Sequence, residues 1–139
     1  MSRHRIQLRG PWQLEWTSEG GESAEKIRLP VEWDELFSGR VGRVCLTRKF
    51  HRPTNLGPNE QVDLLFEQWP GVWIVSLNHH RVGEVRDASS ESPERITITA
   101  SLESTNVLAA ETQIEQPADP LLRRGLMGKV ALEIRSDDE

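Results

Sequence analysis

The chain has 139 residues, enough for one ordinary domain with a buried core, and we take residues 1–139 as that single domain. Its 17 basic and 22 acidic residues give a net charge of -5 and are interspersed, so no basic stripe could follow a nucleic-acid backbone. The start, MSRHRIQLRG, lacks the apolar stretch of a secretion signal, and no segment approaches the ~20 apolar residues of a membrane span. We therefore expect a cytoplasmic protein that contacts neither nucleic acid nor membrane.

Apolar residues recur with period two, which is typical of strands rather than helices. Glycine, proline and asparagine clusters separate the runs, and this pattern of short strands predicts an all-β sandwich or barrel. One short helical turn is predicted from Asp34 to Phe37. The predicted strand segments are IRLPVEW (27–33), GRVCLTRKFH (42–51), QVDLLFEQ (61–68), VWIVSLN (72–78), RITITASL (95–102) and KVALEIRS (129–136).

Period two also predicts which side chains share a face of the sheet. The inward sets are Val62, Leu64 and Phe66 in one strand, and Trp73, Val75 and Leu77 in another.

Five tryptophans and no tyrosine make a biased aromatic set, and we expect at least three of the five to be structural. Trp69 precedes Pro70-Gly71, a turn signal, so we expect its ring at the rim of the sheet, with Trp16 the next most exposed.

Two adjacent histidines, His79 and His80, could suggest a metal site, with Glu84 or Asp87 as a third ligand. A strand sends such neighbours to opposite faces, and Asn78 readily takes the positive φ of a hairpin turn. We therefore predict a turn here, and no metal.

Catalytic motifs are absent from the sequence. There is no Gly-x-Ser-x-Gly elbow, and the single cysteine, Cys45, lies in a strand-like run where a half-buried structural role is expected. Any acid pair could arise by chance among 22 acidic residues, and GLMGK (125–129) lacks the spacing of a phosphate-binding loop, so a turn into the last strand is expected. No cofactor is predicted.

Several motifs follow one another in a specific order. These are LRGPWQLEW, LPVEW, GRVCLTRKFHRP, GVWIVSLNHHRVG, ITITASLESTNVLAA and GLMGKVALEI. In this order they resemble the N-terminal sugar-binding domain of family 2 glycoside hydrolases, the β-galactosidase and β-glucuronidase group.

That resemblance implies a galactose-binding-like jelly-roll β-sandwich with a core from about residue 6 to 134. In such enzymes the catalytic residues lie in a separate barrel that is absent from this sequence, so we expect a stand-alone module that is not an enzyme. Two positions differ from the family pattern: His79 replaces the hairpin glycine, and Pro93-Glu94 replaces Pro-Phe.

The first functional hypothesis is a non-catalytic carbohydrate-binding module. The segments 69–72 and 87–93 would form its rim, with Trp69 as a stacking platform and Arg81, Arg86 and Asp87 bonding to sugar hydroxyls.

The alternative hypothesis is a protein-interaction or self-association module that keeps the fold without binding sugar. Its contact surface would include Leu121, Leu122 and Met127 beside Arg123 and Arg124.

Overall fold

The structure, a computed structural model, describes residues 3–17, 25–32, 42–54, 56–114 and 126–136. Most of this part is strand, and a short 3₁₀ helix lies at Thr99–Ser101. The strands are β1 (Arg3–Gln7), β2 (Trp12–Trp16), β3 (Glu25–Ile27), β4 (Val31–Glu32), β5 (Gly42–His51), β6 (Glu60–Glu67), β7 (Trp69–Leu77), β8 (His80–Ala88), β9 (Glu94–Thr97), β10 (Thr105–Ile114), β11 (Leu126–Met127) and β12 (Lys129–Ser136).

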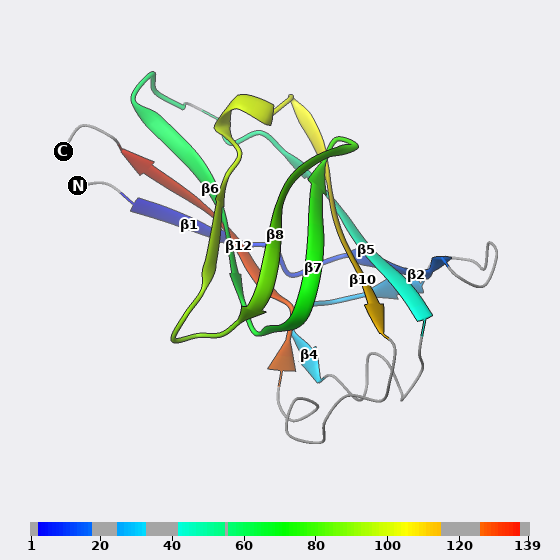
Figure 1. Cartoon of the computed structure of the whole chain (residues 1–139). Coiled ribbons are helices and arrows are strands. Elements are labelled where there is room, and N and C mark those ends of the chain that lie inside the picture. Colours follow the sequence, from blue (N-terminus) through cyan, green and yellow to red (C-terminus); the bar gives the residue numbers. More distant parts are fainter. Residues whose placement is uncertain (1–2, 18–24, 33–41, 55, 115–125, 137–139) are drawn as a thin grey trace.

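Two antiparallel sheets form a sandwich (Figure 1). The four-stranded sheet has the order β1-β12-β6-β9, and the six-stranded sheet has the order β3-β2-β5-β10-β7-β8. A further small ladder pairs β11 with β4. Most neighbours in the sheets are distant in sequence, as in a jelly roll, so the predicted all-β sandwich is confirmed. Within the described residues, no helix is long and apolar enough to cross a membrane.

The core lies between the two sheets and is built from the inward positions that period two predicts. Both predicted inward sets are fully buried. They are Val62, Leu64 and Phe66 on β6, and Trp73, Val75 and Leu77 on β7. Cys45 is half-buried on β5, as expected. Because each inward side chain alternates with an outward one, the outer face of each sheet carries the polar residues.

An aromatic cluster fills the centre of the core, and here the sequence-based prediction was wrong. Trp69 is 0% exposed, and its ring meets Phe66 at 5.3 Å and Trp73 at 5.0 Å in edge-to-face contacts. Its indole Nε1 donates to the Lys129 carbonyl at 2.9 Å. Trp16, the second expected exposed ring, is only 6% exposed.

Pro70-Gly71 does not end the strand, and this explains the burial of Trp69. β7 continues through both residues with an irregularity in its pairing to β8 between Trp69 and Val72. Such a bulge absorbs the turn signal while keeping the strand paired, so Trp69 stays inside the sandwich.

The hairpin between β7 and β8 turns at Asn78, as predicted, and the turn has two residues. Asn78 and His79 have φ values of +52° and +70°, and Leu77 pairs with His80. The Asn78 side chain accepts a hydrogen bond from Val107 N and donates to Asn106 Oδ1. The turn is therefore fastened to β10 and serves as scaffold.

Three predicted segments differ in detail or fall outside the description. RITITASL is a strand only to Thr97, because the Thr99 hydroxyl accepts a hydrogen bond from Val62 N where the 3₁₀ helix begins. IRLPVEW is divided between β3 and β4. The predicted helical turn from Asp34 to Phe37 lies outside the described residues.

Gly128 forms the turn between β11 and β12, as GLMGK suggested. Its φ is +91°, and a Cβ at this position would lie 2.9 Å from a methyl carbon of Leu29. Only glycine fits both the backbone angle and the close packing.

Candidate functional site

The predicted rim lies along β8 and the start of β7. Arg81 and Arg86 are exposed, with side-chain exposures of 60% and 67%, and both approach Glu84, at 3.7 and 2.7 Å. Asp87 accepts a hydrogen bond from Gly71 N at 2.7 Å, so the segments 69–72 and 87–93 do meet at this point. One Asp87 carboxylate oxygen is therefore occupied with the backbone.

Trp69 cannot serve as a stacking platform at this rim in the conformation described. A sugar stacks on an accessible ring face, and the Trp69 ring has none. Every aromatic ring of tryptophan or phenylalanine within the described residues is buried, namely Trp12, Trp16, Phe50, Phe66, Trp69 and Trp73.

The outer face of the six-stranded sheet carries a polar row that crosses all six strands. Each residue of the row pairs directly with the next one, and the residues are basic at both ends and small or polar between them. In order across the sheet they are Lys26, Gln13, Thr47, Ala109, Ser76 and Arg81. At ~4.8 Å between strands, the row is about 24 Å long.

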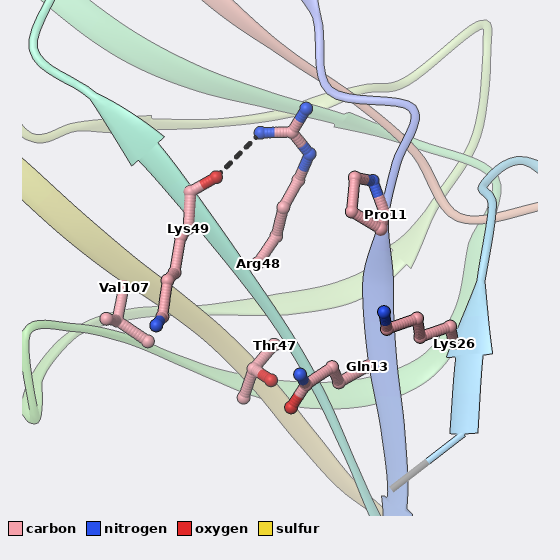
Figure 2. A pocket seen from close by; sticks show the side chains of 7 residues that line it. All are labelled: Pro11, Gln13, Lys26, Thr47, Arg48, Lys49 and Val107. Atoms are coloured by element: carbon pink, nitrogen blue, oxygen red, sulfur yellow. Dashed lines mark hydrogen bonds between the residues drawn. The ribbon is translucent and has the colours of Figure 1, made fainter.

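A hollow of about 210 Å³ opens at the β3 end of this row (Figure 2). Figure 2 shows Gln13 and Thr47 side by side, with Lys26 to one side of them and Lys49 and Val107 to the other. Pro11 and Arg48 complete the lining of the hollow. Two ammonium groups, an amide, a hydroxyl and two apolar side chains thus border one space.

Arg48 also lines the hollow, but its side chain extends to the opposite side of β5 from Thr47 and Lys49 (Figure 2), and it has no carboxylate partner within the described residues. Its Nη1 donates to the Lys49 carbonyl at 2.9 Å and its Nη2 donates to the Gly10 carbonyl at 3.3 Å. Its Nε is buried without a hydrogen-bond partner in the described part. Burial lowers the pKa of the Arg48 guanidinium.

An acidic row runs beside the polar row on the same face. Glu15 and Glu111 each pair with Cys45 from opposite sides. Burial, then the charges of Glu111 and Glu15, raise the pKa of the Cys45 thiol to about 11. The thiol is therefore protonated at neutral pH and is a poor nucleophile.

The outer face of the four-stranded sheet carries a different arrangement, a closed charge network. Asp63 and Glu133 are directly opposed on β6 and β12 and are 0% and 1% exposed. Arg95 donates to both carboxylates at 2.7 Å, Arg135 donates to Asp63 at 2.7 Å, and Arg5 donates to Glu133 at 2.6 Å. Thr97 adds a hydrogen bond to Asp63.

The network keeps both buried carboxyl groups ionised. Burial alone would raise the pKa of Asp63, but hydrogen bonds from Thr97, Arg135 and Arg95 hold that pKa below its usual range. The pKa of Glu133 is lowered in the same way by Arg5 and Arg95 against the effect of burial.

The described residues contain no group of three or more metal-ligating side chains close enough to hold an ion. His79 and His80 occupy the turn and the start of β8, and both are exposed. Of the predicted interaction surface, Leu121, Leu122, Arg123 and Arg124 lie outside the described residues, and Met127 is 1% exposed.

Sequence reasoning missed the hollow because its residues come from separate strands. The alternation in TRKF marks Thr47 and Lys49 as outward residues of β5. Nothing local indicates that Lys26 and Gln13 pair beside them, since that depends on the register of β3 and β2.

No protein-family model and no curated protein sequence matches the chain. Solved structures do match its fold. The FMN-binding β-glucuronidase from Facaelibacterium prausnitzii L2-6 aligns with a TM-score of 0.78 at 21% identity over 97% of this chain and 23% of that one. The β-glucuronidase of Bifidobacterium dentium complexed with coumarin-3-O-glucuronide aligns at 0.73 and 16% over 99% of this chain and 30% of that one.

A third structure, the β-D-glucuronidase of Dictyoglomus thermophilum, aligns with a TM-score of 0.74 at 15% identity over 97% of this chain and 28% of that one. The chain thus spans less than a third of each of these three proteins. The resemblance predicted from the motifs is confirmed at the level of the fold: the chain has the same sandwich as one part of these β-glucuronidases.

Proposed function

We propose that the protein is a non-catalytic carbohydrate-binding module whose ligand lies along the polar row on the outer face of the six-stranded sheet. The observation that supports this most is the hollow, where Gln13 and Thr47 point outward between two lysines. Neither of these two side chains makes a hydrogen bond to another described residue, so their donors and acceptors are available to sugar hydroxyls.

The shape of the row suits an extended ligand. The hollow of about 210 Å³ is smaller than the ~300–1,000 Å³ of sites for drug-sized molecules, so it fits one sugar unit. Further units would continue over Ala109 and Ser76, whose short side chains leave the sheet surface low. At the other end, Arg81 would bond to the last unit, while Arg86 and Asp87 would flank it from the rim.

Resemblance to sugar-active enzymes gives a second, weaker support. The solved β-glucuronidases with this fold act on glycosides, and one was solved with a glucuronide. The chemistry of three groups supports a non-catalytic role: the buried carboxylates Asp63 and Glu133 are each paired with arginine, and the Cys45 thiol is protonated at neutral pH, so none of the three is an activated nucleophile.

A protein-interaction role is the second candidate, and one observation favours it. Within the described residues no tryptophan or phenylalanine ring is exposed, so the usual stacking contribution to sugar binding is missing there. In this reading the same polar face would contact a protein partner or a second copy of the chain.

Titration of the protein with a panel of glycans tests the proposal, with the binding affinity measured by isothermal calorimetry. The double variant Gln13→Ala/Thr47→Ala should weaken binding at least about tenfold, because it removes hydrogen bonds to the ligand. Arg81→Ala should weaken the binding about threefold to tenfold if the ligand spans the row. The matched control, Ser101→Ala, alters a polar side chain that lies outside the row and should leave the affinity unchanged.

Two outcomes would contradict the proposal. Absence of binding to every glycan, with a concentration-dependent increase in mass by light scattering, would favour self-association. Sugar binding that is insensitive to Gln13, Thr47 and Arg81 would place the ligand elsewhere on the molecule.

A further inference from the structure

We infer that the hollow selects an anionic substituent on the saccharide, a carboxylate or a sulfate ester, held between Lys26 and Lys49. This rests on the proposed function and names the chemical class of its ligand. Lys26 reaches the hollow from β3 and Lys49 reaches it from β5, across the Gln13–Thr47 pair (Figure 2).

The charges around the hollow are unbalanced, in a protein whose net charge is -5. Neither Lys26 nor Lys49 forms an ion pair within the described residues, and the Arg48 guanidinium bonds only to backbone carbonyls there. The nearest acidic side chains on this face stand one row away, and of these Glu111 is already paired with Arg43 at 2.9 Å. The two ammonium groups that face the hollow therefore attract an anion.

Arginines elsewhere in the protein show the contrast. The three arginines over the four-stranded sheet all contact Asp63 or Glu133, so their charge is neutralised within the fold. Around the hollow no carboxylate of the described residues takes this position. A carboxylate or sulfate of the ligand would supply the missing negative charge, and it could accept hydrogen bonds from both ammonium groups and from the Thr47 hydroxyl.

The apolar lining indicates a sugar that carries the charge rather than a free ion. Pro11 and Val107 border the same space and offer apolar surface that a hydrated inorganic anion does not use. Sugar C–H groups would cover this surface while the charged substituent reaches the lysines.

The test compares three size-matched oligosaccharides: an oligogalacturonide, its fully methyl-esterified form, which is neutral, and a sulfated galactan oligosaccharide. Inorganic sulfate is the fourth probe. Calorimetry at ~50 and ~200 mM salt should show at least one acidic oligosaccharide binding about tenfold tighter than the neutral one, with weaker binding at high salt. Whichever acidic probe binds identifies the group as carboxylate or sulfate.

Lys26→Gln and Lys49→Gln should each reduce the affinity for the acidic oligosaccharide about fivefold and reduce its salt dependence. Lys129→Gln is the matched control, since it changes the net charge equally but lies on β12, near Glu67. Both lysines of the hollow are exposed, so the variants should fold, and equal melting temperatures would verify this.

Equal affinity for the neutral and acidic oligosaccharides would overturn the inference while leaving the proposed function intact. An equal loss of affinity from Lys129→Gln would also overturn it, because net charge alone would then explain the effect. Binding of no oligosaccharide would overturn the proposed function and the inference together, whether or not inorganic sulfate binds.

Discussion

The two outer faces of the sandwich differ in whether their charged side chains have partners of opposite charge. On the four-stranded sheet, two buried carboxylates meet three arginines, and every one of these groups has a partner of opposite charge. On the outer face of the six-stranded sheet, Lys26 and Lys49 border a hollow with no carboxylate among the described residues beside them.

This difference separates charges that hold the fold from charges that are available to a ligand. A buried carboxylate without a partner would cost several kcal/mol, so the Asp63–Glu133 pair needs its arginines. Exposed lysines cost little to leave without a partner, because water solvates them. The two faces should therefore respond differently to substitution, with stability affected on one and binding on the other.

The largest effect is expected in the core on which both faces rest. Trp69→Ala should lower the free energy of unfolding by about 3–5 kcal/mol, because it removes a fully buried ring and its contacts with Phe66 and Trp73. Urea unfolding followed by circular dichroism measures this. If that variant does not fold, Trp69→Phe should fold with a smaller loss, since it keeps a ring but loses the hydrogen bond to the Lys129 carbonyl. A Trp69→Ala variant that keeps its full stability but no longer binds sugar would instead indicate that Trp69 contacts the ligand.

Breaking the closed network is the next largest change. Asp63→Ala should destabilise the protein by about 3 kcal/mol, because Arg135 and Thr97 lose their partner on a covered surface. The matched control is Glu84→Ala on the other face, whose pairs with Arg81 and Arg86 are exposed and should contribute less than about 1 kcal/mol. Similar losses for the two variants would mean that the faces do not differ.

The same network makes stability depend on pH. The folded pKa values of Asp63 and Glu133 lie below their ordinary values of about 3.9 and 4.3, so their contribution is complete above about pH 4–5. It is lost as the pH falls through the lowered folded values, because protonation then favours the unfolded chain. Urea midpoints from pH 7 to 2.5 should fall steeply for the wild type and less steeply for Asp63→Asn/Glu133→Gln. Parallel curves would contradict the assignment.

Much of the fold could be predicted from the sequence because it depends on local alternation. The inward set on β6 and the positive φ of Asn78 follow from neighbouring residues alone. The burial of Trp69 could not be predicted, since Pro70-Gly71 forms an irregularity within a paired strand and Phe66 closes over the ring from the other sheet. Both features are set by tertiary packing.

Less of the candidate site could be predicted, for a related reason. Arg81 and Arg86 are exposed side chains of one predicted hairpin, and the structure keeps them at the rim. The hollow joins Lys26, Gln13 and Thr47 from three strands, and only the pairing register brings them together. Likewise, alternation marks Asp63 as outward, but its burial depends on arginines from β9 and β12.

The smallest expected effect is on the stability of the open face. Lys26→Gln and Lys49→Gln should each change the free energy of unfolding by less than about 0.5 kcal/mol, because neither lysine has an ion-pair partner among the described residues. The change should be slightly stabilising, since each substitution relieves repulsion with the other lysine at the hollow. Urea unfolding at low salt measures it. A loss above about 1 kcal/mol would show that these lysines hold the fold, as the arginines on the opposite sheet do, and the contrast between the two faces would no longer stand.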